Sequence, residues 1–339
     1  MSTARCVTNA RPLLVTMGDA AGIGPETIVK AWRAGHLRDA LVVGDVDVMR
    51  RAGSPMTARV EHTSDLAAVP SGCLPVLQPS DLPAGLADLP VGRIDGRNGA
   101  AAARCIEQAV RCVQSREACA IVTAPIHKEA LSAAGIVFPG HTEMLQALAT
   151  QAGQPLPHVR MMLANDELRV VLVTIHTSLR KAIDAVTFEA VLQTLRIAHR
   201  AAAAWQNTPP RIAVAGLNPH AGEGGLFGDE EITTIAPAVQ AAMAEGILAS
   251  GPYAPDTVFM RARRGEFDLV IAMTHDHGLI PVKYLGVEHG VNVTLGLPFV
   301  RTSPDHGTAF DIAGQGLADP SSLIAAAVMA RKLAAATAR

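Results

Sequence analysis

The feature that most constrains the fold is a series of short, continuous apolar runs rich in Val, Ile and Leu, each bounded by Gly, Pro, Asn or His. These runs occupy 12–19, 40–45, 118–128, 169–176, 211–220 and 267–276. Ala-rich stretches of helical character separate several of them, at 101–114, 187–205 and 232–246. Continuous apolar strands that alternate with helices are typical of a largely parallel sheet covered on both faces. The pattern therefore predicts an α/β protein with α/β/α layers.

Length and charge narrow the functional classes. A chain of 339 residues has room for two domains or one large α/β unit. Its formal net charge is −2 and its Lys and Arg residues are scattered, so the basic footprint of a nucleic-acid binder is missing. The first 19 residues show one short apolar run and no h-region followed by a cleavage site, and no apolar run of about 18 residues occurs. We therefore expect a cytoplasmic protein that acts on a small molecule, without nucleic-acid or membrane partners.

The cysteines do not form a recognised disulfide or metal motif. No CxxC pair occurs among the five, which are Cys6, Cys73, Cys105, Cys112 and Cys119. The last three are seven residues apart and fall near one face of a helix, or of a helix that runs into a strand. We interpret them as buried small hydrophobic residues rather than metal ligands or redox groups.

Three of the apolar runs are followed by histidine: His176, His220 and His275. Ligands of parallel α/β sheets bind outside the carboxyl ends of the strands, so these imidazoles are candidates to converge on one point. Neutral imidazole is the commonest protein ligand of divalent metals. The alternative is that each histidine makes hydrogen bonds independently in its own loop, and the spacing alone does not decide between the two interpretations.

Other segments carry groups suited to an anionic ligand. The loop at 217–231 combines a Pro-fixed histidine with glycines and acidic residues, and the GHTE motif at 140–143 offers His141 and Thr142 at a predicted helix start. An N-terminal helix cap is an alternative role for Thr142. A further polar set lies near the C-terminus and consists of Lys283, Asn292, Arg301, Asp305 and His306. Lys and Arg in such a set are suited to hold carboxylate or phosphate.

Several longer motifs together resemble one enzyme family. They are MGDAAGIGPE (17–26), TAPIHK (123–128), GHTE (140–143), GLNPHAGEGG (216–225), GPYAPDTVF (251–259), HDHGLIPVK (275–283) and GVNVTLGLPFVRTSPDHGTAFDIAG (290–314). Their order and content are similar to those of the 4-hydroxythreonine-4-phosphate dehydrogenase family, from about residue 13 to 330. The family includes similar paralogues that act on D-threonate or D-erythronate 4-phosphate and on terephthalate cis-dihydrodiol.

The resemblance implies a fold similar to isocitrate and isopropylmalate dehydrogenases, with a cleft between two subdomains. We expect the first at 11–139 together with 297–335, and the second, with the metal histidines and the dimer interface, at 140–296. The family is an obligate homodimer with its active site at the interface. One divalent metal (Zn, Mg, Mn or Co) is bound through positions that match His176, His220 and His275, one of them reaching across from the partner. The matching substrate contacts are His141, Thr142, Lys283, Asn292 and Arg301.

The implied reaction is NAD- or NADP-linked oxidation with decarboxylation of a phosphorylated 3-hydroxy acid. The first candidate is 4-phosphohydroxy-L-threonine, converted to 2-amino-3-oxo-4-phosphooxybutanoate in pyridoxal phosphate (pyridoxine) biosynthesis. A bound cation such as zinc or magnesium lowers the pKa of the secondary hydroxyl and so favours hydride loss. Lys283 and Asp276 are candidates for the proton transfer of catalysis, because both lie close in sequence to His275.

The nicotinamide site has no signature of its own. AGIGPE supplies Gly22 and Gly24 but not the third glycine or the later acidic partner of a dinucleotide fingerprint. Its local pattern predicts a strand-to-helix turn with Pro25 and Glu26 in the first helical turn. We therefore assign no residue to cofactor binding.

Three positions depart from the family pattern. Ala20 stands where proline is usual, Thr274 where tyrosine is usual, and His277 where glutamine is usual. We interpret His277 as a neighbour of the metal site and not as a fourth ligand. Two other functions remain open: a metal-dependent hydrolase or lyase that uses the same histidines, and a non-catalytic binder of sugar acids.

Overall fold

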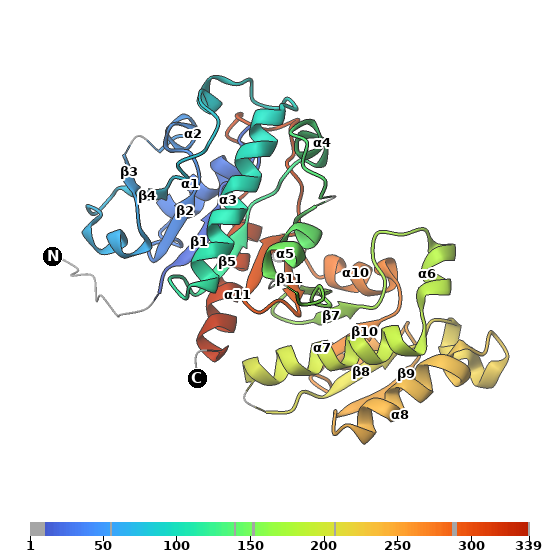
Figure 1. Ribbon diagram of the computed structural model, residues 1–339. Coiled ribbons are helices and arrows are strands. Elements are labelled where there is room, and N and C mark those ends of the chain that lie inside the picture. The colour runs from blue at the N-terminus through green and yellow to red at the C-terminus, as the bar shows by residue number, and fades with distance from the viewer. Residues whose placement is uncertain are drawn as a thin grey trace. The chain divides into compact units, whose positions relative to one another are not determined.

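A computed structural model of the protein describes residues 11–54, 56–138, 140–150, 153–206, 208–286 and 290–337 (Figure 1). Cys6 and Pro139, which precedes the GHTE motif, lie outside these residues. The chain divides into two compact units. The first contains the described residues up to Pro157 and Leu297–Ala334, and the second contains His158–Gly296 and the chain end. Residues 140–157, which the sequence prediction joined to the second subdomain, group with the first unit, where α5 packs against α3.

The first unit is built on a parallel sheet in the order β3-β4-β2-β1-β5-β12. Its strands are β1 (Leu13–Thr16), β2 (Ala40–Val43), β3 (Thr57–Val60), β4 (Leu74–Leu77), β5 (Ala120–Thr123) and β12 (Arg301–Pro304). Its helices are α1 (Gly24–Arg33), α2 (Val46–Arg51), α3 (Gly96–Gln114), α4 (Lys128–Ala133), α5 (His141–Ala149) and α11 (Ser321–Thr337), with short 3₁₀ turns η1 (Thr63–Ala68) and η2 (Leu86–Asp88). The central strands are completely buried, as their apolar sequences require.

In the second unit the neighbouring strands follow the order β11-β6-β7-β10-β8-β9. The strands are β6 (Arg160–Ala164), β7 (Arg169–Leu172), β8 (Ile212–Ala215), β9 (Ala249–Tyr253), β10 (Leu269–Ala272) and β11 (Val291–Leu295). The helices are α6 (Leu179–Ala185), α7 (Phe188–Gln206), α8 (Ala236–Ala244), α9 (Val258–Arg263) and α10 (His275–Tyr284), with the shorter η3 (Pro219–Gly225) and η4 (Glu231–Ile235). β6 runs antiparallel to both of its neighbours, and the pairs among β7, β10, β8 and β9 are parallel.

The predicted mixed α/β architecture is confirmed. Each of the six apolar runs contains a strand, and the three Ala-rich stretches fall on α3, α7 and the η4–α8 segment. The AGIGPE turn leads into α1 as expected, with Pro at the helix start and Glu26 in the first turn. The sequence prediction missed strands such as β3 (TARV) and β12 (RTSP), because they are too short or too polar to show an apolar run.

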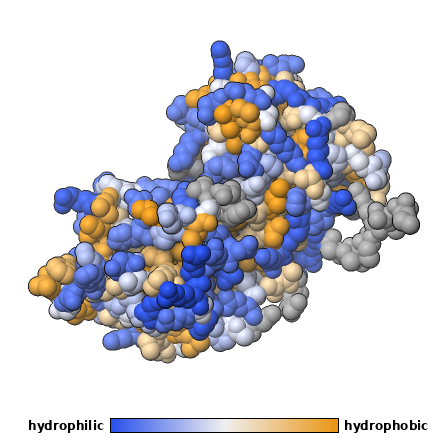
Figure 2. Space-filling view, turned by 180° about the vertical axis from the view of Figure 1, so that it is seen from behind, coloured by the Kyte–Doolittle hydropathy of each residue, from blue (hydrophilic) through white to orange (hydrophobic). Residues whose placement is uncertain are grey.

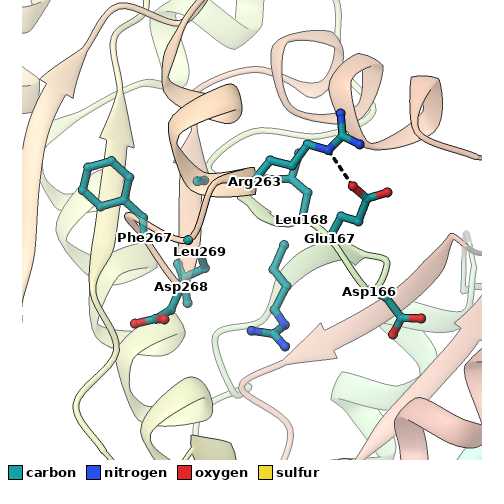
Figure 3. Close-up of a pocket in the computed structure, with 10 residues that line it drawn as sticks. Asp166, Glu167, Leu168, Arg263, Phe267, Asp268 and Leu269 are labelled. Atoms are coloured by element: carbon teal, nitrogen blue, oxygen red, sulfur yellow. Dashed lines mark hydrogen bonds and ion pairs between the residues drawn. The ribbon is translucent and has the colours of Figure 1, made fainter.

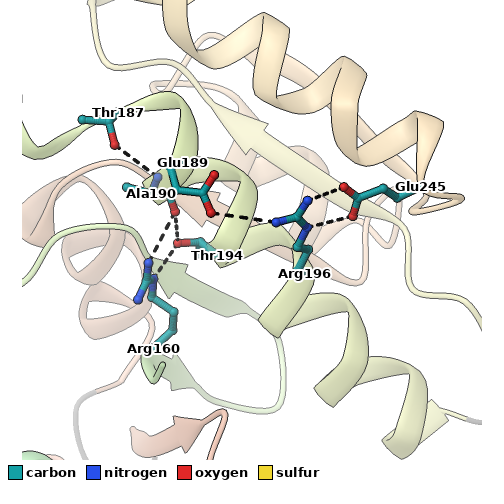
Figure 4. A network of polar contacts seen from close by, with 7 residues as sticks. All are labelled: Arg160, Thr187, Glu189, Ala190, Thr194, Arg196 and Glu245. Carbon is teal, nitrogen blue, oxygen red and sulfur yellow. Dashed lines mark hydrogen bonds and ion pairs between the residues drawn. The ribbon is translucent and has the colours of Figure 1, made fainter. Parts of the chain in front are cut away.

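Side chains of the second unit fasten helix α7 to its surroundings (Figure 4). Arg160 of β6 donates to Thr194 Oγ1 at 2.6 Å and to the Ala190 carbonyl oxygen at 3.4 Å. On the exposed side, Arg196 forms a two-pronged ion pair with Glu245, which directly follows α8. The helix is thus held by one buried polar contact and one exposed contact.

The surface in Figure 2 is mostly hydrophilic, with hydrophobic patches separated from one another. In the part of the chain that the structure describes, no helix combines the length and the apolar character needed to cross a membrane. Cys105 and Cys112 are buried in α3, as predicted for small hydrophobic residues, whereas Cys119, for which the same was predicted, is only partly buried because it lies before β5 and outside the helix.

Candidate active site

The second unit brings the carboxyl ends of three histidine-bearing strands to one edge. β10 lies between β7 and β8 and is parallel to both, so the segments that follow these strands are neighbours. His275 is the first residue of α10, directly after β10. His176 follows β7 before α6 begins, and His220 follows β8 within η3. This is the edge at which parallel sheets bind ligands.

His176 and His275 lie side by side. Their ring centroids are 5.8 Å apart and their planes are tilted by 46°. Two imidazoles that share one cation through bonds of about 2.1 Å have ring centres roughly 5–6 Å apart, so this spacing fits a common metal. His275 Nδ1 donates to Asp276 Oδ1 at 2.8 Å, which leaves Nε2 as the nitrogen with a lone pair for a ligand. The pair is therefore arranged as two ligands of a metal site would be.

His220 lies in a turn of unusual backbone conformation. His220, Ala221, Gly222, Glu223 and Gly224 all have φ between 46° and 79°. Within this turn His220 Nδ1 donates to Glu223 Oε2 at 2.8 Å, and its ring meets Phe227 edge-on at 6.2 Å. His220 thus repeats the arrangement of His275, with a carboxylate on Nδ1 and Nε2 left for a ligand.

The three histidines do not gather into one group within a single chain. Among the residues described, no cluster of three or more His, Cys, Asp or Glu side chains is placed to hold a metal ion. The structure therefore brings His176 and His275 together. His220 lies apart from them, and its side chain is 61% exposed.

The first unit contains a buried cationic group. Arg301 opens β12, is 3% exposed, and donates from Nε and Nη2 to Thr123 Oγ1 at 3.1 and 2.6 Å. Burial lowers the pKa of Arg301 to about 10. Burial and the nearby Arg301 charge hold the pKa of His141, the first residue of α5, well below its usual value. A neutral imidazole beside a desolvated guanidinium suits an anion, which would relieve both penalties.

The other predicted substrate residues lie on three elements. Thr142 follows His141 in the first turn of α5 and is partly buried, without a capping hydrogen bond at the Gly140 helix start. Lys283 lies near the end of α10, and Asn292 lies on β11 opposite Leu163; both are partly buried. Because Asp276 and Lys283 are seven residues apart on α10, they lie on the same helical face.

Two buried polar residues of the first unit were not predicted from the sequence. The side chains of Asp19 and Asn98 are buried, and Asp19 Oδ2 and both amide atoms of Asn98 have no hydrogen-bond partner among the described residues. Burial raises the pKa of Asp19 to about 6, and His127 opposes this effect. These residues belong to the quoted motifs or stand at the start of α3, but no spacing rule marked them. Unpaired buried polar atoms indicate a place for a polar ligand or water.

Two hollows lie in the second unit. An apolar groove of about 610 Å³ runs beside α10 and includes Pro219, Asp276, His277, Ile280 and Tyr284. It thus touches residues next to two of the candidate metal ligands. A smaller hollow of about 310 Å³ is lined by charged residues such as Asp166, Glu167 and Arg263 (Figure 3). None of the predicted site residues lines it, and Arg263 is already paired with Glu167 at 2.5 Å.

The departures from the family pattern are placed as follows. Thr274 is buried directly before His275, and His277 is exposed and lines the apolar groove. Ala20 is buried, and its carbonyl oxygen accepts a hydrogen bond from Arg51 at 2.6 Å. His277 therefore lies next to the histidine pair without forming part of it.

Comparisons with known proteins identify the family of this chain. The family model described as "Pyridoxal phosphate biosynthetic protein PdxA" matches residues 36–330. The chain is 56% identical to a 4-hydroxythreonine-4-phosphate dehydrogenase of Beijerinckia indica, over 92% of each chain. It is 43% identical to a D-threonate 4-phosphate dehydrogenase of Pectobacterium atrosepticum, over 95% of this chain and 99% of the relative.

Solved structures give the same result. The crystal structure of a 4-hydroxythreonine-4-phosphate dehydrogenase from Klebsiella pneumoniae is 40% identical in sequence to this chain. The match has a TM-score of 0.86 and covers 98% of this chain and 99% of the other. Motif order, sheet-edge histidines, family model and relatives thus lead to one conclusion: this chain belongs to the PdxA family.

Proposed function

We propose that the protein is a metal-dependent, NAD(P)-linked dehydrogenase that oxidises and decarboxylates a phosphorylated 3-hydroxy acid. The observation that carries this proposal is the His176–His275 pair, with ring centres 5.8 Å apart and a carboxylate on His275 Nδ1. Relatives that are named dehydrogenases and share 43–56% identity support an oxidoreductase. Our first candidate substrate is 4-phosphohydroxy-L-threonine, after the named activity of several relatives.

A second candidate substrate is D-threonate 4-phosphate or its D-erythronate analogue. It is supported by two D-threonate 4-phosphate dehydrogenases that are 43% and 46% identical to this chain. Both candidates are phosphorylated hydroxy acids. Because Arg301 and His141 provide a desolvated cation and a neutral imidazole, they suit the phosphate of either one.

The donor set fits a divalent cation. His176 and His275 would hold it through Nε2, while Asp276 holds the His275 ring in its tautomer and orientation. Once bound, the cation would supply the positive charge that lowers the pKa of the substrate hydroxyl and stabilises the charge left when carbon dioxide departs. Since the Asp276 carboxylate is engaged by His275, we assign the proton transfer to Lys283 on the same face of α10. Asn292 would orient the substrate by hydrogen bonds.

A second copy of the chain would supply the third ligand. His220 carries the same Nδ1–carboxylate contact as His275 but lies outside any three-residue group in the described chain. The apolar groove beside α10 gives a physical reason for a homodimer. Its residues Ile280 and Tyr284 are 65% and 90% exposed, and burying them against a second copy is favourable.

Our candidates for cofactor binding are the unpaired polar atoms of the first unit. The amide of Asn98 offers both a donor and an acceptor, and Asp19 Oδ2 offers an acceptor. The carboxamide and ribose hydroxyls of a nicotinamide nucleotide have complementary groups. None of these residues is cationic, in contrast to Arg301, so the set suits the uncharged part of the cofactor and not the substrate phosphate.

A substrate panel tests the proposal. Purified protein is given NAD or NADP, with and without Zn²⁺, Mg²⁺, Mn²⁺ or Co²⁺. The substrates are 4-phosphohydroxy-L-threonine, D-threonate 4-phosphate, D-erythronate 4-phosphate and terephthalate cis-dihydrodiol. We expect metal-dependent formation of NAD(P)H with one of the phosphorylated acids. Formation from the dihydrodiol alone would change the substrate, and no NAD(P)H from any compound would refute the dehydrogenase.

A further inference from the structure

The turn that presents His220 has a backbone that its own residues do not favour. His220, Ala221 and Glu223 have φ of 51°, 54° and 46°, and none of them is a glycine. L-residues avoid this left-handed region because Cβ crowds the following carbonyl oxygen. A run of such residues persists only where surrounding contacts fix it. The position of the His220 imidazole therefore depends on whatever holds this turn.

Besides backbone hydrogen bonds within the turn, the buried carboxylate of Glu231 contacts this segment. Glu231 is 3% exposed, and its Oε1 accepts from the backbone N–H groups of Leu217 and Asn218 at 2.6 and 2.8 Å. Its Oε2 accepts from Asn218 Nδ2 at 2.9 Å. These contacts fix the segment that leads into the turn.

The same carboxylate also touches the turn itself. A Cβ atom on Gly222, which has φ of +79°, would lie 2.8 Å from Glu231 Oε2. The backbone of Gly222 therefore lies directly against the carboxylate. Glu231 is in contact with the chain on both sides of His220, and the turn is closed around it.

The charge of Glu231 is maintained inside this loop. Burial raises the pKa of Glu231, but the hydrogen bonds from Asn218 and Leu217 outweigh burial, so the net pKa lies below its usual value. A carboxylate that accepts several N–H bonds is stable as an anion. An amide in its place would present a donor toward groups that are themselves donors.

The neighbouring Glu230 provides a natural comparison. It accepts from Asn218 Nδ2 at 2.6 Å, so it shares one partner with Glu231. Its observed hydrogen bond comes from a side chain and not from the backbone, and it is more exposed than Glu231. The two glutamates thus have the same charge and a common partner, but the observed hydrogen bonds to the backbone near His220 are those of Glu231.

We propose that Glu231 is a positioning residue of the metal site, which acts by fixing the left-handed turn that carries His220. This inference rests on the proposed role of His220 as a metal ligand. Glu231 does not touch the metal or the substrate. It sets the place and direction of His220, and Glu223 sets the rotation of the imidazole through Nδ1.

The experiment measures metal affinity of the full-length protein without substrate or cofactor. Metal-free protein is titrated with Co²⁺ and, separately, with Zn²⁺ in competition with a chromophoric chelator. The variants are Glu231→Gln, the matched control Glu230→Gln, His220→Ala, and the Glu231→Gln/His220→Ala double variant. Thermal midpoints and oligomeric state are recorded for each. Gly222→Ala disturbs the same contact from the other side and keeps the carboxylate, so it serves if Glu231→Gln does not fold.

We expect Glu231→Gln to weaken metal binding by about 10–100-fold, as is usual for residues that orient metal ligands. Glu230→Gln should stay within about threefold of wild type. On the His220→Ala background the Glu231→Gln change should add little, because its effect is transmitted through His220. A purely structural role would lower the thermal midpoint without this dependence on His220.

Two results overturn the inference, and they are distinguishable. If His220→Ala weakens metal binding but Glu231→Gln and Gly222→Ala bind as wild type does, Glu231 has no positioning role and the metal site stands. If His220→Ala binds Co²⁺ and Zn²⁺ as tightly as wild type, then His220 is not a ligand, and the proposed metal site fails together with this inference.

Discussion

The two polar regions of the molecule are built in opposite ways. In the first unit Arg301 is buried on a strand, is held by Thr123, and is accompanied by a desolvated His141. In the second unit the candidate metal ligands lie on loops and helix starts, where the side chains of His275 and His220 are 39% and 61% exposed. Arg301 is fixed by packing and by Thr123, whereas His275 and His220 are each oriented by a carboxylate on Nδ1.

The two regions therefore differ in how far the single chain fixes their side chains. Arg301 is fixed within the chain, whereas we propose that the histidines gain further contacts from a metal ion and a second copy. Burying a guanidinium is costly, so the position of Arg301 is set by the buried surroundings and the hydrogen bonds that hold it. Exposed imidazoles have a small desolvation cost, and they contribute binding energy when a cation is bound. Substitutions in the two regions should therefore change different properties: metal content at the histidines and substrate KM at Arg301.

The largest effect is expected at the histidine pair. His275→Ala removes one proposed ligand, and the loss of metal charge stabilisation should lower kcat/KM by roughly 1000-fold or more. Metal content by mass spectrometry and NAD(P)H formation are the measurements. His277→Gln is the matched control, because His277 is exposed and lies two residues away; it should keep its metal. Full metal content in His275→Ala would contradict the assignment.

A smaller effect is expected at the buried cation. Arg301→Lys keeps the charge but loses the planar guanidinium that donates twice to Thr123, so substrate KM should rise by about 100-fold. Metal content should not change, which distinguishes this variant from His275→Ala. Arg97→Lys, at an exposed residue of α3, is the control. An unchanged KM in Arg301→Lys would show that Arg301 does not bind the anion.

The sequence predicted the second region better than the first. The strand-end histidines stand out because β7, β10 and β8 are long apolar runs that end at one edge. Arg301 was noted only as one member of a polar set suited to an anion, since β12 reads RTSP and no apolar pattern marks it as a buried strand. Lys283 and Asn292 belonged to the same set, and their substrate roles remain predictions.

Other features depend on tertiary contacts that no local pattern encodes. The antiparallel β6 was missed because RMMLA is short and partly exposed. The burial of Asp19 and Asn98 follows from the packing of loops and α3 over the sheet edge, not from their own sequence. The left-handed turn at His220 is contacted by Glu231, which is eleven positions further along the chain. The sequence contained this glutamate within an acidic loop but did not show which carboxylate turns inward.

The stability of the protein should also depend on pH through Asp19, a buried residue of the first unit. Its pKa is raised from 3.8 to about 6, so its contribution to stability is fully present below 3.8 and is lost as pH rises through 6. Asp19→Asn removes this loss and should stabilise the protein at pH 8 by at most about 3 kcal/mol, with a smaller gain at pH 5. Thermal midpoints from pH 5 to 8 measure the difference. An equal shift at both pH values would contradict the raised pKa.

The smallest effect is expected at the exposed ion pair of Arg196 and Glu245, opposite the buried Arg160–Thr194 contact on the same helix (Figure 4). Exposed pairs gain little because water screens them and the side chains lose freedom, so Arg196→Ala should shift the thermal midpoint by no more than about 1 °C. The shift should shrink further in high salt. Thr194→Val, which leaves the Arg160 guanidinium without this acceptor, should lower the midpoint by several times as much. Equal midpoint shifts in the two variants would show that burial does not determine how strongly a polar contact stabilises this protein. The proposed contrast between the buried Arg301 region and the exposed histidines would then lose its physical basis.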